Sequence, residues 1–144
     1  AGFLVMLWEL IKDRPDVHKG WLEAELDAQL FMLDLNNSSA IAEMADDQTE
    51  GILRKTLWAS LYGTNPKSIG GGPDKNIFDF IFNDKAQGLV NAATIFLNGR
   101  KVVPNPVLRS ESIWDAVARD VLKARGLSSP IGSVKEQPDS AYKK

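Results

Sequence analysis

Apolar residues recur at helical spacing along most of the chain. The longest such pattern predicts a helix over about residues 16–35, whose leucines are three or four positions apart. These leucines are Leu22, Leu26, Leu30 and Leu33. A second apolar stripe runs from Ile52 to Leu61 and predicts a helix that ends at Gly63, because Pro66 follows where a helix cannot resume.

Three shorter helices are predicted around these two. Residues 3–11 are apolar in eight of nine positions, which indicates a short helix buried in a core or against a partner. Ser38 or Ser39 can cap a short third helix. The last helix begins at Ser110 or Ser112 and ends at Gly126. Its apolar face consists of Ile113, Val117, Val121 and Leu122.

Two segments are ambiguous. In residues 84–103, Asn98-Gly99 is a strong signal for a short hairpin near residue 98. The same segment also carries a helical stripe: Leu89, Val90, Ala93, Phe96 and Leu97. We favour the helix, with Asp84 as its cap, because the alanines and glycine before Asn98 are poor strand formers. Residues 77–82 form an aromatic-rich run that fits a strand or a buried helical turn equally well.

The remaining segments read as loops. Residues 64–76 hold three consecutive glycines between two prolines, which excludes regular structure. Residues 127–144 contain few large apolar side chains, so we expect a flexible tail. The chain is therefore predicted to be an all-α protein. We expect a compact bundle of five or six helices in a single domain over residues 1–126, followed by the tail.

Composition excludes several classes of chemistry. The 144 residues include no cysteine, so disulfides, thiolate catalysis and cysteine-bound zinc are excluded. His18 is the single histidine, and its place in a helical first turn suggests an ordinary surface residue. No catalytic constellation, metal site or cofactor motif is recognisable. We therefore expect a non-enzymatic protein without a cofactor.

An alternative hypothesis is a small ligand-binding or enzymatic domain that uses the glycine loop. Residues 67–75 combine backbone N–H groups with Lys67 and Lys75, which could cradle a phosphate. A phosphate-binding loop, however, follows a buried strand and opens a helix. Here a helix precedes the loop, so we keep this reading as an alternative.

Charge is unevenly distributed along the chain. Residues 1–50 carry a net charge of −8 and residues 51–144 a net charge of +6, although the whole chain is at −2. Such asymmetry can bring the two parts together within one molecule or between copies. It also permits a nucleic-acid regulator that uses a basic surface over residues 100–125, but the isoelectric point of 5.4 is low for that role.

The function favoured by these patterns is protein–protein interaction or self-assembly, as in a coat, adaptor or scaffold subunit. Tryptophan is enriched in interface cores, and all four tryptophans fall beside the apolar stripes of predicted helices. The predicted partner-binding residues are Phe3, Leu7, Trp8, Trp21, Trp58, Trp114, Arg119 and Lys123. The partner is itself, as a ring or filament, or another protein. No stretch reaches the roughly 18 apolar residues of a membrane span, and we expect a cytoplasmic protein or a part of an assembled particle.

Overall fold

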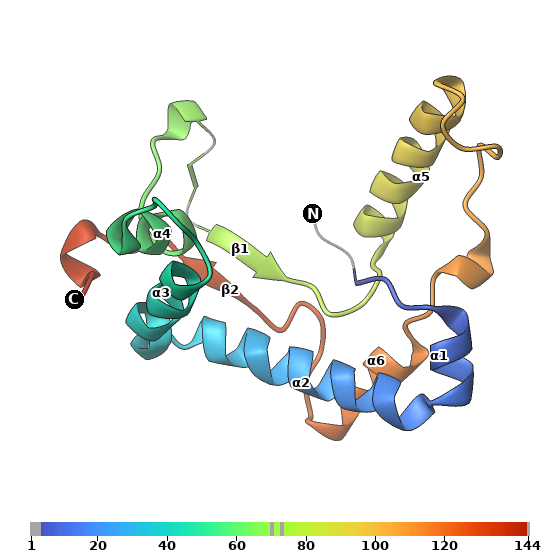
Figure 1. The fold of residues 1–144 in the computed structure, drawn as a ribbon, viewed down its shortest axis with the longest axis horizontal. Coiled ribbons are helices and arrows are strands. Elements are labelled where there is room, and N and C mark those ends of the chain that lie inside the picture. The colour runs from blue at the N-terminus through green and yellow to red at the C-terminus, as the bar shows by residue number, and fades with distance from the viewer. Residues whose placement is uncertain (1–3, 70, 73, 144) are drawn as a thin grey trace. The chain divides into compact units, whose positions relative to one another are not determined.

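A computed structural model describes residues 4–69, 71–72 and 74–143 (Figure 1). These residues form a predominantly helical protein with six α-helices and a small two-stranded sheet. The contacts divide the chain into two compact units. Unit 1 contains the residues up to Glu23 together with Asp79–Ser128, and unit 2 contains Ala24–Phe78 together with the residues from Ser129 onward. The expected all-α class is therefore correct for most of the chain and wrong for the sheet.

The long helix α2 spans Pro15–Leu33 and belongs to both units. Its bounds agree closely with the helix predicted from the leucine spacing. Proline is well tolerated at its first position, where the missing N–H would have no helical partner. Leu26 is fully buried. His18 is also buried, with 6% of its surface exposed, so the expectation of a surface histidine is wrong.

Unit 2 is built around two packed helices, α3 (Ser38–Asp47) and α4 (Arg54–Leu61). Trp58 and Tyr62 are completely buried at the centre of its core. The Trp58 ring lies 6.3 Å from that of Tyr62 and 5.6 Å from that of Tyr142. Aromatic side chains from α4 and from the last residues of the chain thus hold this unit together.

The sheet of unit 2 pairs β1 (Asp74–Phe78) with β2 (Gly132–Lys135) in an antiparallel arrangement. β1 starts at Asp74, so the expectation that residues 64–76 contain no regular structure is wrong for the last three of them, and the first two residues of the aromatic run continue the strand. β2 corrects the expectation of a flexible tail, because Val134 is 1% exposed and belongs to the core. With one large apolar residue in a four-residue strand, β2 offers no periodicity that a sequence pattern could reveal.

Unit 1 contains the helices α1 (Trp8–Asp13), α5 (Asp84–Gly99) and α6 (Ala116–Ala124). α1 is shorter than predicted because residues 4–7 have no regular structure and Leu7, the residue before the helix, is extended. α6 likewise begins later than predicted, after a separate 3₁₀ turn. It supplies the buried residues Ala118, Val121 and Leu122. By contrast, α1 and α5 contain no fully buried residue.

The structure resolves residues 84–103 in favour of the helix. The side chain of Asn83 caps α5 by accepting a hydrogen bond from the Ala86 N–H at 2.9 Å, so the cap lies one residue before the expected Asp84. No hairpin forms near residue 98. Asn98 instead donates its side-chain amide to the Val103 carbonyl, 3.0 Å away, and the left-handed residue is Lys101 with φ of 59°. Within the described part of the chain, no helix is both long and apolar enough to cross a membrane.

Candidate interaction surface

Two of the predicted partner-binding tryptophans meet in unit 1. The rings of Trp8 and Trp114 pack edge to face, with centroids 5.5 Å apart and an interplanar angle of 74°. Trp8 projects from the first turn of α1, and Trp114 lies two residues before α6. About half of each side chain remains exposed, at 51% and 49%. The pair therefore presents a rigid aromatic surface to solvent.

The tryptophan pair borders an apolar hollow of about 550 Å³ within unit 1. Its lining residues are Met6, Trp8, Ile11, Glu111, Ser112 and Trp114. Four of the six are large and apolar, and the other two add a carboxyl and a hydroxyl group. Such a hollow fits apolar side chains inserted by a partner and offers few polar groups to a small ligand.

The other predicted aromatic and aliphatic contacts do not join this hollow. Leu7 and Trp21 are exposed in unit 1, at 74% and 54%, but neither lines it. Trp58 is wholly buried in the core of unit 2, which corrects its assignment to a partner surface. Phe3 lies outside the described residues.

Arg119 and Lys123, the predicted cationic contacts, lie on α6. Arg119 forms a two-point ion pair with Asp115, at 3.0 Å from Nε and 2.8 Å from Nη2. This hydrogen bonding raises the pKa of the guanidinium above its usual range. Lys123 is exposed. Because the arginine is already matched to a carboxylate, α6 is less suited to phosphate contacts than its sequence implies.

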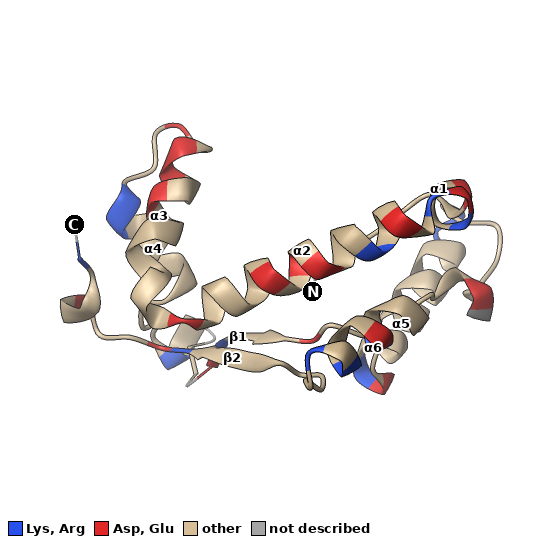
Figure 2. Ribbon diagram, turned by 90° about the horizontal axis from the view of Figure 1, so that it is seen from below, with Lys and Arg blue, Asp and Glu red and all other residues tan. Residues whose placement is uncertain are grey.

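The charge asymmetry of the sequence is largely balanced within the folded units. Unit 1 contains nine acidic and ten basic side chains, and unit 2 contains ten acidic and seven basic ones. Figure 2 shows acidic residues along α2 and at the end of α3. Arg54 at the start of α4 lies 3.1 Å from Asp46 and 3.3 Å from Glu43. Residues from the acidic and basic parts of the sequence thus meet within unit 2.

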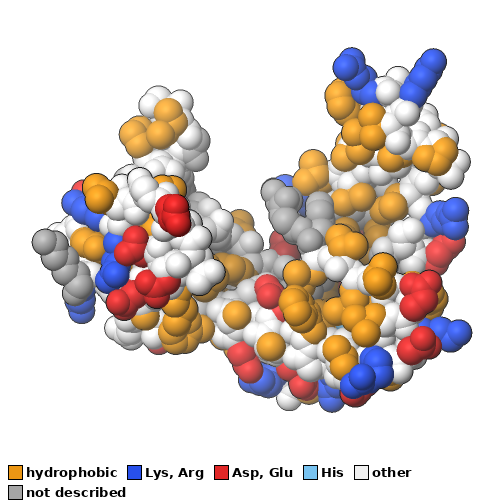
Figure 3. Space-filling model, viewed as in Figure 1, with side chains coloured by type: hydrophobic (Ala, Val, Ile, Leu, Met, Phe, Trp, Pro, Cys, Tyr) orange, Lys and Arg blue, Asp and Glu red, His pale blue; other side chains and the backbone are white. Residues whose placement is uncertain are grey.

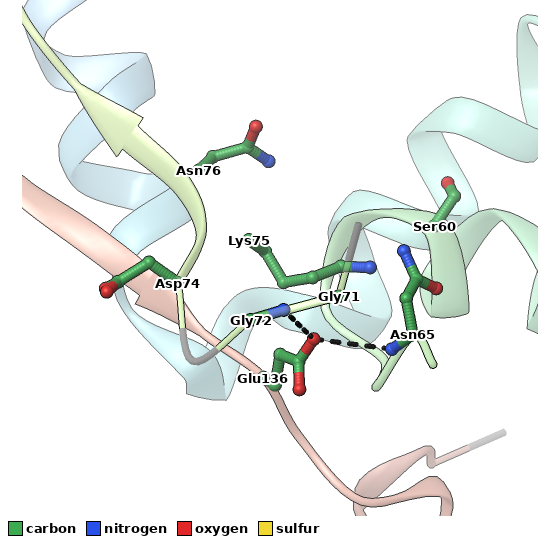
Figure 4. Close-up of a pocket in the computed structure, with 8 residues that line it drawn as sticks. All are labelled: Ser60, Asn65, Gly71, Gly72, Asp74, Lys75, Asn76 and Glu136. Carbon is green, nitrogen blue, oxygen red and sulfur yellow. Dashed lines mark hydrogen bonds between the residues drawn. The ribbon is translucent and has the colours of Figure 1, made fainter. Parts of the chain in front are cut away.

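A small polar pocket of about 160 Å³ lies beside the glycine loop of unit 2 (Figure 4). Its lining residues are Ser60, Asn65, Gly71, Gly72, Asp74, Lys75, Asn76 and Glu136. Glu136 accepts backbone N–H groups from Asn65 and Gly72, both at 3.3 Å. Its carboxylate occupies donors that a bound phosphate would need, which weakens the phosphate-binding reading of residues 67–75.

The exposed face of α5 is a candidate site that the sequence analysis did not select. Leu89 is 52% exposed and Phe96 is 66% exposed, although both belong to the stripe that predicts the helix. Figure 3 shows hydrophobic side chains gathered on the surface of α5. The stripe predicts a helix, but its spacing alone does not distinguish a core contact from an interface.

Comparisons with known proteins identify no relative: no family model, curated protein or solved structure matches the chain. Within the described residues, no group of three or more histidine, aspartate or glutamate side chains is arranged to hold a metal ion. The surface chemistry of the two units therefore carries the functional argument.

Proposed function

We propose that this protein is a non-enzymatic self-assembly module, a coat- or scaffold-type subunit that associates through exposed apolar surface. The observation that carries the proposal is the amount of surface left uncovered. The chain exposes 10,244 Å², whereas a folded monomer of this size exposes roughly 7,400 Å². Even two separate units of half the size would expose only about 8,900 Å² together.

The uncovered surface is apolar in unit 1. α1 and α5 contain no fully buried residue, yet both carry large apolar side chains. Val5, Leu7 and Phe96 are exposed by 93%, 74% and 66%. Large exposed apolar patches are uncommon on monomeric proteins and are typical of interaction sites. The Trp8–Trp114 pair supplies a rigid aromatic anchor of the type that dominates interface energetics.

Light scattering coupled to size-exclusion chromatography tests the proposal. We expect the mass of the wild-type protein to rise above 15.9 kDa as its concentration increases. Trp114→Ser should weaken association about thirtyfold, because truncation of a central aromatic anchor costs about 2 kcal/mol or more.

Trp21→Ser provides a matched control, since Trp21 is also half-exposed in unit 1 but lies outside the hollow. Circular dichroism should show the same helix content in both variants. A wild-type protein that remains a monomer at every concentration would contradict the proposed function.

A further inference from the structure

We propose that copies of this chain associate head to tail, with the exposed face of α5 in one copy docked on the turn between α3 and α4 of the next copy. This inference deepens the proposed self-assembly and rests on it. It adds a second contact to that of the Trp8–Trp114 hollow, identifies the two surfaces that form it and gives the symmetry of the assembly.

The first surface is the α5 face, defined by Leu89, Ala93 and Phe96. These residues follow one another at three- and four-residue spacing, so their side chains share one side of the helix. All three are exposed. Only a neighbouring line of α5 residues is even half-buried: Ala86, Val90, Thr94 and Asn98. The helix thus packs along one edge and leaves an apolar face uncovered.

Cationic side chains flank the α5 face, with a carboxylate, Asp84, beside the single lysine at the N-terminal end and two cations together at the C-terminal end. Lys85 lies one turn before Leu89, and Arg100 and Lys101 follow the last turn of the helix. All three are exposed, and none forms an ion pair with another described residue within the salt-bridge distance of 4.0 Å. A partner surface should therefore combine apolar contacts with negative charge.

The second surface is the α3–α4 turn, residues 47–53 of unit 2. Ile52 and Leu53 are 45% and 77% exposed in this turn. Asp47 and Glu50 are exposed beside them, and no described cation lies within ion-pair distance of either. The turn is held at its base by Arg54, which bridges Glu43 and Asp46 of α3. The turn therefore presents two carboxylates and two aliphatic side chains to solvent, on a base held by ion pairs.

Charge complementarity selects the turn as the occupant of the α5 face. If two α5 helices paired antiparallel about a two-fold axis near Ala93, Lys85 of one copy would lie beside Lys101 of the other. If the two helices paired in parallel, Lys85 of one copy would face Lys85 of the other, and Arg100 and Lys101 would face the same residues of the other copy. Parallel pairing opposes like charges, and antiparallel pairing offers Arg100 and Lys101 a single carboxylate, Asp84, which lies beside the like-charged Lys85. The α3–α4 turn instead brings two carboxylates, Asp47 and Glu50, to the cations at the C-terminal end of α5.

The uncovered area also fits a head-to-tail contact. A stable interface buries about 800 Å² on each partner. In a head-to-tail array each copy contributes both surfaces, so it buries about 1,600 Å² in total. The whole chain exposes roughly 1,300 Å² more than two separate folded units of half its size, which is of the same order as the area that such a contact buries. Such a heterologous contact closes into a ring or continues as a filament.

The decisive experiment mixes two variants that each lack one surface. Phe96→Asp disables the α5 face, and Leu53→Asp disables the turn. Both positions are exposed, so the folds should survive, which circular dichroism checks. Each variant alone should associate at least tenfold more weakly than the wild type. Mixed together in a Trp114→Ser background, which removes the contribution of the hollow, they should form a one-to-one dimer and nothing larger, because one intact surface of each kind remains.

Val107→Asp and Ile69→Asp are matched controls, because both residues are 72% exposed outside the two surfaces, one in each unit. They should leave the wild-type mass unchanged. Replacing both Arg100 and Lys101 with glutamate should weaken assembly. Replacing Asp47 and Glu50 with lysine in the same protein should then restore it.

The outcomes separate this inference from the function on which it rests. If the wild type assembles but the Phe96→Asp and Leu53→Asp mixture stays monomeric, the head-to-tail contact is wrong and self-assembly stands. If the wild type is a monomer at every concentration, both are overturned.

Discussion

Gly71 illustrates how a single residue sets the shape of the glycine loop. A Cβ added at Gly71 would lie 1.8 Å from the carbonyl oxygen of Asn65, which is backbone and cannot swing away. Gly71→Ala should therefore destabilise unit 2 by about 1–3 kcal/mol in urea unfolding. Gly72→Ala is the control, because its Cβ would meet nothing within 4 Å. Equal stability of the two variants would show that the loop does not approach this closely.

Tyr62 gives unit 2 a dependence on alkaline pH. Burial raises the pKa of its hydroxyl from 10.0 to about 12, and the hydroxyl donates to the Met32 carbonyl at 3.2 Å. Above about pH 10 the unfolded chain releases this proton while the folded chain retains it, so the free energy of unfolding falls as pH rises.

Comparison with Tyr62→Phe isolates this contribution, because other titrating groups are common to both proteins. The stability difference between wild type and variant should shrink by up to about 2–3 kcal/mol between pH 10 and 12. Urea unfolding across that range measures it. A constant difference would mean that Tyr62 ionises equally in both states.

For single residues, the sequence could not distinguish buried from exposed aromatic side chains. Trp58 and Trp114 both sit beside an apolar stripe, but Trp58 is fully buried and Trp114 is half-exposed. The difference arises from Tyr142, which is distant in sequence and packs on Trp58. Local spacing predicts which face of a helix is apolar and does not reveal what covers it.

At the level of elements, β2 should be essential to unit 2. Val134→Ala removes two methyl groups from a core position that is 1% exposed, so we expect a loss of about 1–3 kcal/mol. Ile77→Ala in the paired strand is the control, since Ile77 is 60% exposed and should cost much less. Chemical denaturation measures both. A negligible effect at Val134 would support the original expectation of a flexible tail.

Elements with a long apolar period were predicted well, and those that depend on distant pairing were not. The leucine spacing gave α2 almost to its ends, and propensity correctly favoured the helix over a hairpin for α5. β2 has four residues and is stabilised by hydrogen bonds to β1, more than fifty residues away. Such pairing leaves little trace in local composition. α5 shows a different limit: its helical stripe predicts the helix correctly, although most of the stripe, including Leu89 and Phe96, is exposed.

For the whole molecule, charge along the sequence was a poor guide to charge in space. Each unit combines residues from the acidic segment 1–50 with residues from the basic segment 51–144, so the net charges of −8 and +6 are not separated between the units. Local charge differences remain: two cations, Arg100 and Lys101, at the C-terminal end of α5 and two carboxylates, Asp47 and Glu50, on the α3–α4 turn. The proposed assembly depends on these local groups and not on the net charge of either unit.

The division into two units predicts two unfolding transitions in the intact protein. Contacts cluster within each unit, and each has its own buried residues, such as Leu122 in unit 1 and Val134 in unit 2. Separate clusters of this kind unfold as separate cooperative steps. In calorimetry, Leu122→Ala should lower the midpoint of one transition and Val134→Ala that of the other. Each substitution should cost about 1–5 kcal/mol in its own unit. A single transition lowered by both substitutions would mean that α2, which belongs to both units, couples them into one cooperative structure.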